Sequence, residues 1–348
     1  MSRPELIITN FNQRFTGVSS TAAAVTRAQI GTFDLRLVGQ ELPGLPAPIS
    51  LVEALRLSRR PKEGRPFTIW HVRRNTEMQA ALFARDVLRL PIRIVFTSAA
   101  QRVHSRWPRF LISRMDRVIA TTDEAASFLH RVAAVVPHGV DTDAFRPAED
   151  RRAAWAATGY PGASGIATIG RIRPEKGTDR FVDTAIRVLP ALPGLTALVI
   201  GRARDGDTEF LDGLRRKVAE AGLGDRIIFT GELPPDELRR IVPALSLLVA
   251  LPRYEGYGMT PLEAMASGVP VVATDTGHFR AFVGQNEAGR IVEPDEAAAA
   301  ILSLLSGPAD LENLGRSARH RAESGFAIEG EARAVARVYD SLWNAQGA

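Results

Sequence analysis

The chain has 348 residues, with 44 Lys and Arg against 39 Asp and Glu, and a formal net charge of +5. This length exceeds a single ordinary hydrophobic core and favours two domains of roughly 150 residues each. The absence of cysteine excludes disulfide bonds and thiolate metal sites, and the segment that begins at Met1 enters a strand-like run without the apolar core of a signal peptide. We therefore expect a soluble protein of the cytoplasm.

The positive charge is concentrated in the first part of the chain. Residues 1–145 contain 20 Arg and Lys against 12 Asp and Glu, whereas the remainder contains 24 against 27. A basic half of this kind favours an anionic partner. Nucleic acid, phospholipid headgroups and an acidic glycan all fit this charge.

Short apolar and β-branched runs alternate with Ala- and Arg-rich segments of helical spacing. In the first half the predicted strands are 6–9, 35–38, 67–70, 92–96, 118–121 and 134–136. In the second half they are 166–169, 197–200, 227–230, 247–251 and 269–273. Continuous apolar strands separated by helices are typical of parallel sheets covered on both faces. We expect two doubly wound α/β domains that bind ligands at the carboxyl ends of their strands.

The first predicted strand leads into a turn at Gly17 and then an Ala-rich helix. A glycine there would let a phosphate or a sugar approach the backbone, and a flexible strand-to-helix turn is the alternative. The chain contains neither the glycine pattern of dinucleotide-binding folds nor a P-loop lysine.

Two further strand ends in the first half carry polar side chains. One is followed by His71, Arg73 and Arg74, and the other by Thr97 and Ser98. Imidazole, guanidinium and hydroxyl groups at this edge could hold the polar groups of an acceptor substrate. A histidine beside a strand is more often structural, which is the alternative for His71.

A basic and aromatic run occupies residues 101–117. Five arginines are interleaved there with apolar residues that include Trp107 and Phe110. This mixture suits the interface of an anionic membrane. Pro108 interrupts it, and a solvated helix face over a small core contact is the alternative.

Asp141 and Asp143 form an Asp-x-Asp pair in a segment punctuated by Pro and Gly. A metal site needs several converging oxygen ligands, and no third carboxylate lies nearby in the sequence. We therefore predict that the pair binds no metal ion.

The loop Gly170–Gly177 follows the first predicted strand of the second half and precedes a helix expected near Asp179. Its cations, Arg171 and Lys176, could stabilise negative charge that develops on a leaving phosphate. A surface loop with a Glu175–Lys176 charge pair is the alternative, but it does not explain the flanking glycines.

A glycine loop and a helix start follow the predicted strand 247–251. Thr260 is expected to cap this helix, with Pro261 at the first helical position and Glu263 completing a capping box. Gly258 lets the backbone approach a bound group, and the helix start presents free N–H groups and a partial positive charge. The sequence therefore predicts an anion site in this loop.

The segment from Glu255 to Glu263 resembles the glutamate, seven residues, glutamate motif of retaining GT-B glycosyltransferases of the GT4-like family, also called glycosyl transferases group 1. The loop with Arg171 and Lys176 resembles the diphosphate clamp of the same family. The likeness covers nearly the whole chain and is strongest from Gly170 onward.

This resemblance implies the organisation of the chain. Residues 1–145 would form a Rossmann-like acceptor-binding domain, and residues 146–328 a Rossmann-like domain for the nucleotide sugar that faces it across a cleft. Residues 329–348 would form a helix that crosses back to the first domain. The helical apolar stripe near the C-terminus fits that helix and consists of Val335, Val338, Tyr339 and Leu342.

The resemblance also implies roles for individual residues. Arg171 and Lys176 would clamp the donor diphosphate, and Glu255 would hold hydroxyls of the donor sugar, so these three are the predicted catalytic residues. Glu263 would hold the ribose hydroxyls. The remaining predicted donor-binding residues are Gly17, Gly258, Met259 and Thr260.

The chain departs from the family at several positions. Thr97 or Ser98 stands where many relatives have a histidine that contacts the donor sugar, and His278 and Ala281 replace a glycine and a glutamate. The Phe-Thr-Ser run ending at Ser98 and the Trp-His-x-Arg-Arg segment before it resemble the lipopolysaccharide core mannosyltransferases of alphaproteobacteria.

Taken together, these likenesses imply a metal-independent, retaining mannosyltransferase that uses GDP-mannose and no cofactor. Its partners would be a nucleotide-sugar donor and an anionic glycolipid acceptor of the lipopolysaccharide core, with peripheral association at the cytoplasmic face of the inner membrane and no nucleic acid. One alternative is a sugar-nucleotide 2-epimerase of the same architecture. The other is a non-enzymatic binder of nucleotide sugars or nucleic acid.

Overall fold

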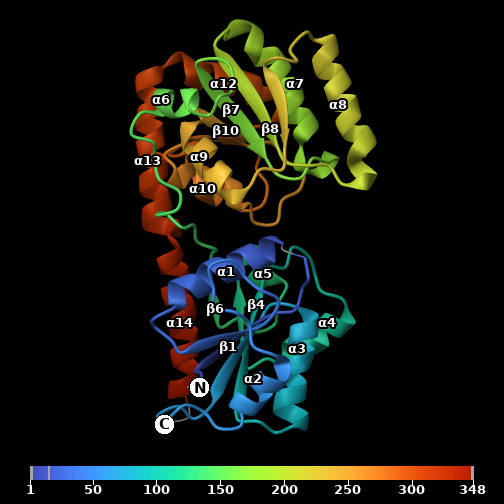
Figure 1. Ribbon diagram of the computed structural model, residues 1–348, viewed down its shortest axis with the longest axis vertical. Helices are drawn as coiled ribbons and strands as arrows, with labels where there is room; N and C mark the ends of the chain where they lie inside the picture. Colours follow the sequence, from blue (N-terminus) through green and yellow to red (C-terminus); the bar gives the residue numbers. More distant parts are fainter. Residues whose placement is uncertain (1–2, 15, 346–348) are drawn as a thin grey trace. The chain divides into compact units, whose positions relative to one another are not determined.

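The computed structural model describes residues 3–14 and 16–345 (Figure 1). The chain forms two compact units, of which the first comprises the described residues up to Gly139 and from Ile328 onward, and the second comprises Val140–Ala327. The first division therefore lies earlier than the predicted boundary after residue 145, and the second lies after Ala327 rather than residue 328. Val140 belongs to the second unit because it forms a parallel bridge with Ala327 and its N–H donates to the Phe326 carbonyl at 2.8 Å.

The first unit contains a six-stranded parallel sheet in the order β2-β1-β3-β4-β5-β6. Its strands are β1 (Leu6–Asn10), β2 (Leu35–Gly39), β3 (Thr68–Val72), β4 (Ile92–Ser98), β5 (Arg117–Ala120) and β6 (Ala134–Val135). Its helices are α1 (Gly17–Gln29), α2 (Leu51–Leu57), α3 (Asn75–Leu82), the π-helix η1 (Phe83–Val87), α4 (Arg106–Ser113), α5 (Asp123–Ser127) and α14 (Ile328–Asn344).

Helices cover both faces of this sheet, which is why apolar residues occur on both faces of its strands. Leu6 and Ile8 belong to the cluster formed with α1 and α14, whereas Ile7 belongs to the cluster formed with α2, α3 and α4. The predicted stripe of α14 is buried, α14 packs against α1, and Trp343 Nε1 donates to the Phe67 carbonyl at 3.1 Å. The C-terminal helix is thus part of the first unit, as predicted.

The second unit contains a six-stranded parallel sheet in the order β12-β11-β10-β7-β8-β9. Its strands are β7 (Ser164–Ile169), β8 (Leu195–Ile200), β9 (Ile227–Gly231), β10 (Leu247–Ala250), β11 (Val271–Ala273) and β12 (Gly289–Ile291). Every strand predicted from the sequence is present, with small shifts at the ends. The edge strand β12 was not predicted, because Gly-Arg-Ile is too short and too polar to stand out.

Helices again cover both faces of the sheet. One face packs against α6 (Arg151–Ala156), α9 (Pro235–Ile241), η5 (Val242–Ala244), α10 (Met259–Ala266), α11 (Phe279–Val283) and α13 (Pro308–Phe326). The other packs against α7 (Thr178–Val188), η3 (Leu189–Ala191), α8 (Thr208–Glu220) and α12 (Ala297–Ser306). Short 3-10 turns complete the unit: η2 (Pro174–Lys176), η4 (Asp205–Asp207) and η6 (Pro294–Glu296). Among the described helices, none combines the length and the apolarity needed to cross a bilayer.

The strand orders locate the ligand-binding edge of each unit. In the second unit the chain runs outward from β7 through β8 to β9, and then from β10 through β11 to β12 on the other side. The order therefore reverses between β7 and β10, and in the first unit it reverses between β1 and β3. Open α/β sheets bind ligands at the carboxyl ends of the strands beside such a reversal.

Candidate active site

The loops after β7 and β10 meet at the reversal point of the second unit. They line a hollow of about 20 Å³, which has room for about one water molecule. The hollow is the floor of the candidate donor site, and it brings together the three predicted catalytic residues with one of the predicted binding residues: Arg171, Lys176, Glu255 and Thr260.

Lys176 and Glu255 form an ion pair across this floor. The other carboxylate oxygen of Glu255 accepts the Gly256 N–H at 2.9 Å. Both side chains are mostly buried, with 23% and 18% of their surface exposed. The two predicted catalytic groups therefore neutralise one another.

Backbone and side-chain contacts fasten the two loops together. The N–H groups of Arg253 and Tyr254 donate to the Glu175 carbonyl at 2.9 and 3.2 Å. The Arg253 guanidinium forms two hydrogen bonds with the Asp179 carboxylate at 2.8 and 2.7 Å. A bidentate pair of this kind fixes orientation as well as distance, so the cation loop and the glutamate loop are held in register.

Two glycines permit this close approach. Gly177 has φ +66°, and a Cβ there would lie 1.9 Å from the Leu251 carbonyl oxygen. Gly258 has φ +89°, and its Cβ would lie 2.0 Å from a ring carbon of Phe279. Any other residue would be strained by its backbone angles. A side chain at Gly177 would also force the two loops apart, and one at Gly258 would force the start of α10 away from α11.

The start of α10 differs from the prediction. Gly258 occupies the capping position in a left-handed conformation, Met259 is the first helical residue and Thr260 the second. The predicted capping box between Thr260 and Glu263 is therefore wrong. Pro261 still lies in the first turn, where its missing N–H breaks no helical hydrogen bond. The N–H groups of Met259 and Thr260 have no intrahelical acceptor, and Thr260 lines the hollow together with Arg171 and Lys176, which suits an anion.

Glu263 lies one turn into α10 and is left without the capping role that would have explained it. The residue is partly exposed, but burial of its carboxyl raises the pKa to about 7, and the field of Arg239 only partly opposes this. A ligand that donates hydrogen bonds to this carboxyl would stabilise its ionised form and lower its pKa.

Arg171 belongs to a group of cations. Burial lowers the pKa of its guanidinium, and the neighbouring charges of Arg173 and Arg204 lower it further. Arginine keeps its charge in proteins. The lowered pKa therefore reflects burial of the guanidinium and repulsion from its neighbours, and a bound anion would relieve that repulsion. Arg204 was missed by the sequence interpretation. Its place shortly after the end of β8, at the same edge of the sheet, was the signal that could have found it.

In the first unit, His71 does not lie at the open edge that was predicted. It lies inside β3 and is buried, with Nδ1 2.6 Å from the Tyr339 hydroxyl and Nε2 2.7 Å from the Thr97 hydroxyl. Burial, and then the charge of Arg73, lower the pKa of His71 well below its usual range. The neutral His71 ring links Thr97 of β4 to Tyr339 of α14. This position corresponds to the structural alternative for His71.

Arg74 organises the loop that follows β1. Its guanidinium donates to Asn10 and Glu77 at 2.9 and 3.0 Å, and to the hydroxyls of Thr16 and Ser19 at 3.3 and 2.9 Å. Glu77 is fully buried and was not predicted as part of the site. Nothing in its local sequence distinguishes it, because its partners come from β1, from the loop after β1 and from the segment between β3 and α3.

Two of the predicted acceptor residues keep unused polar atoms. Arg73 Nη1 and Ser98 Oγ are buried and have no hydrogen-bond partner among the described residues. Gly17 is the first residue of α1 and is exposed, and a Cβ there would meet nothing within 4 Å. Packing therefore does not explain this glycine.

The acidic pair near the division between the units has local roles. Asp141 Oδ1 accepts the N–H groups of Asp143 and Ala144 at 3.1 and 2.8 Å, and Asp143 pairs with Arg146. Within residues 3–14 and 16–345, no group of three or more His, Cys, Asp or Glu is arranged to hold a metal ion. Independence from metal remains a prediction.

The departures at His278 and Ala281 fall beneath the glutamate loop. The His278 ring stacks on Tyr257, with centroids 5.2 Å apart and planes 14° apart, and packs edge-on against Phe282. Ala281 lies in α11, and its carbonyl accepts from Arg321 at 2.7 Å. His278 thus fills an aromatic cluster that supports the loop.

Similarity to known proteins agrees with this arrangement. The family model "Glycosyl transferases group 1" matches residues 161–321. The chain is 44% identical to the lipopolysaccharide core biosynthesis mannosyltransferase LpsB of Rhizobium meliloti, over 97% of each chain. It is 40% identical to the lipopolysaccharide core biosynthesis mannosyltransferase LpcC of Rhizobium leguminosarum bv. viciae, over 97% of this chain and 96% of that one.

Similarity to a solved structure extends the likeness to the fold. The crystal structure of Anabaena Alr3699/HepE in complex with UDP and glucose superposes with a TM-score of 0.80, at 15% identity and over 97% of this chain and 99% of that one. The fold is that of the GT-B glycosyltransferases. The chain belongs to the glycosyl transferases group 1 family, and it is a glycosyltransferase.

Proposed function

We propose that this glycosyltransferase transfers mannose from GDP-mannose to an acceptor of the lipopolysaccharide core, with retention of anomeric configuration. The observation that carries the proposal is the near full-length identity of 44% to a relative named as a lipopolysaccharide core biosynthesis mannosyltransferase. The Lys176–Glu255 pair at the reversal point of the second unit supports a sugar-diphosphate donor.

On the donor side, the cations and the helix start act on the diphosphate. Arg171, Lys176 and the first-turn amides of α10 would hold its oxygens. When the bond between the sugar and the diphosphate breaks, negative charge grows on the leaving phosphate. Fixed cations there lower the energy of the transition state more than that of the ground state. Lys176 can act in this way only after it exchanges Glu255 for the phosphate.

The carboxylates act on the neutral parts of the donor. Glu255, released by Lys176, would accept hydrogen bonds from hydroxyls of the donor sugar, and its tie to the Gly256 N–H keeps it oriented. Glu263 would accept the ribose hydroxyls and be held in its ionised form by them. The two glutamates would thus bind different parts of the donor.

Retention follows if the acceptor attacks from the face that the diphosphate leaves. The acceptor oxygen bonds to the anomeric carbon, the bond from that carbon to the phosphate oxygen breaks, and the acceptor proton passes to the departing phosphate. The released nucleoside diphosphate carries that proton away. No enzyme carboxylate is required as nucleophile, and both Glu255 and Glu263 remain available for binding.

On the acceptor side, the first unit offers cations for an anionic glycolipid. Arg73 Nη1 and Ser98 Oγ are the unsatisfied donors at the carboxyl edge of its sheet. Trp107 and Phe110 on α4 are 54% and 55% exposed and stack with ring centroids 5.7 Å apart, which suits a membrane interface. We therefore include peripheral association with the inner membrane in the proposal.

The proposal is tested first on the donor. Thermal unfolding is measured with GDP, UDP and ADP, and product analysis follows with the matching sugar nucleotides and a lipopolysaccharide core acceptor. A bound diphosphate at a hundred times its Kd stabilises by about 2.7 kcal/mol. We expect GDP to give the largest shift and GDP-mannose to give a mannosylated core. A shift confined to UDP would reject the donor, and conversion of the sugar nucleotide without transfer would reject the reaction in favour of 2-epimerisation.

A further inference from the structure

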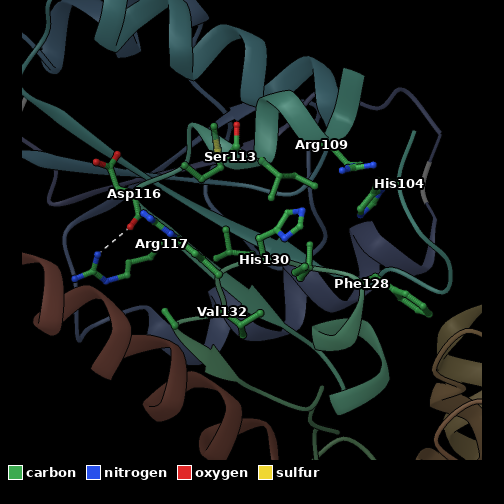
Figure 2. A pocket seen from close by; sticks show the side chains of 14 residues that line it. His104, Arg109, Ser113, Asp116, Arg117, Phe128, His130 and Val132 are labelled. Carbon is green, nitrogen blue, oxygen red and sulfur yellow. Dashed lines mark hydrogen bonds between the residues drawn. The ribbon is translucent and has the colours of Figure 1, made fainter. Parts of the chain in front are cut away.

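The first unit contains a cavity of about 630 Å³ beside α4 (Figure 2). Its walls come from the region of α4, from the beginning of β5 and from residues 128–133. None of the predicted donor or acceptor residues lines it. The cavity therefore has no role in the chemistry proposed above and needs a separate explanation.

The lining of this cavity is amphipathic. Its apolar part consists of Ile112, Met115, Val118, Phe128, Leu129 and Val132. Arginines and histidines make up most of the polar lining, together with Ser113 and Asp116. Figure 2 shows Arg109, His104 and His130 gathered on one side. A ligand that matched this lining would carry an anionic group joined to an apolar one.

The polar side of the cavity is not neutralised from within. His104 Nε2 is buried and has no hydrogen-bond partner among the described residues. The acidic residue of the lining, Asp116, is already paired with Arg85 at 2.8 Å and with Arg93 at 3.6 Å. No ion pair in the described part of the chain involves Arg109 or Arg131, so both charges are available to an anion.

The outer face of the same helix shows where such a ligand would come from. Trp107 and Phe110 are exposed and stacked, and Val103 just before the helix is 63% exposed. Apolar rings beside basic side chains are typical of a surface that lies in the interface of an anionic membrane. The apolar rings and the basic cavity are thus adjacent parts of one surface.

We propose that this cavity binds one anionic membrane phospholipid, whose phosphate lies among Arg109, His104 and His130 and whose acyl chain begins along the apolar lining. The α4 surface would then be held to the bilayer by a specific lipid as well as by adsorption. The inference rests on the proposed function only in taking the acceptor to be carried by a membrane. A free phosphate would satisfy the cations but leave the apolar lining empty.

The test uses the full chain and a short-chain phosphatidylglycerol, kept below its micelle-forming concentration and titrated by calorimetry. We expect saturable binding of one lipid per chain. The paired substitution Arg109→Gln and His130→Gln should weaken it at least tenfold, because both groups are exposed at the cavity and their loss does not disturb the core. Arg106→Gln is the matched control, since Arg106 lies on the same helix but does not line the cavity, and it should bind within twofold of wild type.

A second variant separates the cavity from the membrane-facing rings. Trp107→Ser with Phe110→Ser should reduce sedimentation with phosphatidylglycerol vesicles but leave binding of the short-chain lipid unchanged. Equal loss of the short-chain lipid in Arg106→Gln and in the cavity variant would overturn the proposal, and so would inorganic phosphate binding as tightly as the lipid. GDP binding is measured in every variant and should stay at the wild-type value. Its absence in the wild type would reject the proposed donor without bearing on the lipid result.

Discussion

Lys176 and Glu255 form an ion pair that joins the loop after β7 to the loop after β10. Each is a group that a sugar-diphosphate donor would need for itself, the ammonium for phosphate and the carboxylate for sugar hydroxyls. The two charges therefore satisfy one another, and a donor would have to replace this contact with contacts of its own. Binding energy from the nucleotide would drive that exchange.

Replacing Lys176 with alanine removes the cation nearest to Glu255. We expect kcat/KM for transfer to fall by about 10²- to 10³-fold, the usual cost of losing a preorganised charge stabiliser. Lys217→Ala is the matched control, because Lys217 also pairs with a carboxylate, that of Asp183, but lies exposed on α8. The measurement is the initial rate of both variants and of the wild type with the complete donor. Wild-type turnover in Lys176→Ala would show that Lys176 has no role in the reaction.

Arg171→Ala should lower kcat/KM over a similar range. The variant also relieves the repulsion among Arg171, Arg173 and Arg204, so its free energy of unfolding without ligand should stay the same or rise. Rates and thermal unfolding are measured on the same preparation. A loss of both activity and stability would indicate that Arg171 supports the fold instead.

Glu263 gives a prediction about pH. Burial raises its pKa to about 7 in the folded protein, while in the unfolded chain it keeps an ordinary value near 4.3. Between these values the unfolded state has lost a proton that the folded state retains, so stability falls as pH rises from about 4.5 to about 7. Glu263→Gln removes this dependence. From about pH 4.5 to about pH 7 the Tm of the variant should rise relative to that of the wild type, and above pH 7 the difference should stay constant. A Tm difference that does not change with pH would contradict the raised pKa of Glu263.

Transfer should continue in excess EDTA. In the proposed mechanism Arg171, Lys176 and the helix amides would meet the charge of the diphosphate, so that no metal bridge would be needed. The measurement is the initial rate before and after chelation. Loss of activity that Mg²⁺ or Mn²⁺ restores would show that an ion takes part and would reopen the question of its ligands.

Association with anionic vesicles should weaken as salt is added. The basic balance of residues 1–145 acts over a Debye length of about 8 Å at physiological ionic strength. Sedimentation with neutral and anionic vesicles at low and high salt tests this. Equal sedimentation with both kinds of vesicle, unaffected by salt, would exclude an electrostatic contribution.

The features that could be predicted from the sequence are those that depend on a local pattern of residues. The buried strands stand out because both faces of each sheet are covered, and the loops with Arg171 and Glu255 could be placed at strand ends for that reason. The start of α10 could not be placed, because the Thr-Pro-x-Glu pattern favours a cap at Thr260. The cap lies earlier, at Gly258, whose left-handed conformation and close packing on Phe279 no local pattern reveals.

The environment of individual side chains depends on distant parts of the chain. His71 is neutral and enclosed because Tyr339, 268 positions away, packs against it. Arg74 and Glu77 form a network with residues of β1 that no spacing reveals. Such side chains can be identified as polar groups at a strand end, but their partners are fixed only by the fold.

The most direct test of the donor site compares Glu255→Gln and Glu263→Gln by calorimetric titration with GDP at about pH 8, where wild-type Glu263 is ionised. Loss of a carboxylate that accepts ribose hydroxyls is worth about 1.5 to 3 kcal/mol, so Glu263→Gln should bind GDP about ten- to a hundredfold more weakly. Glu255→Gln frees Lys176 from its partner, so it should bind GDP at least as tightly as wild type and lose turnover with GDP-mannose instead. If Glu263→Gln binds GDP like wild type while Glu255→Gln binds it more weakly, the assignment of ribose to Glu263 and of sugar to Glu255 is contradicted.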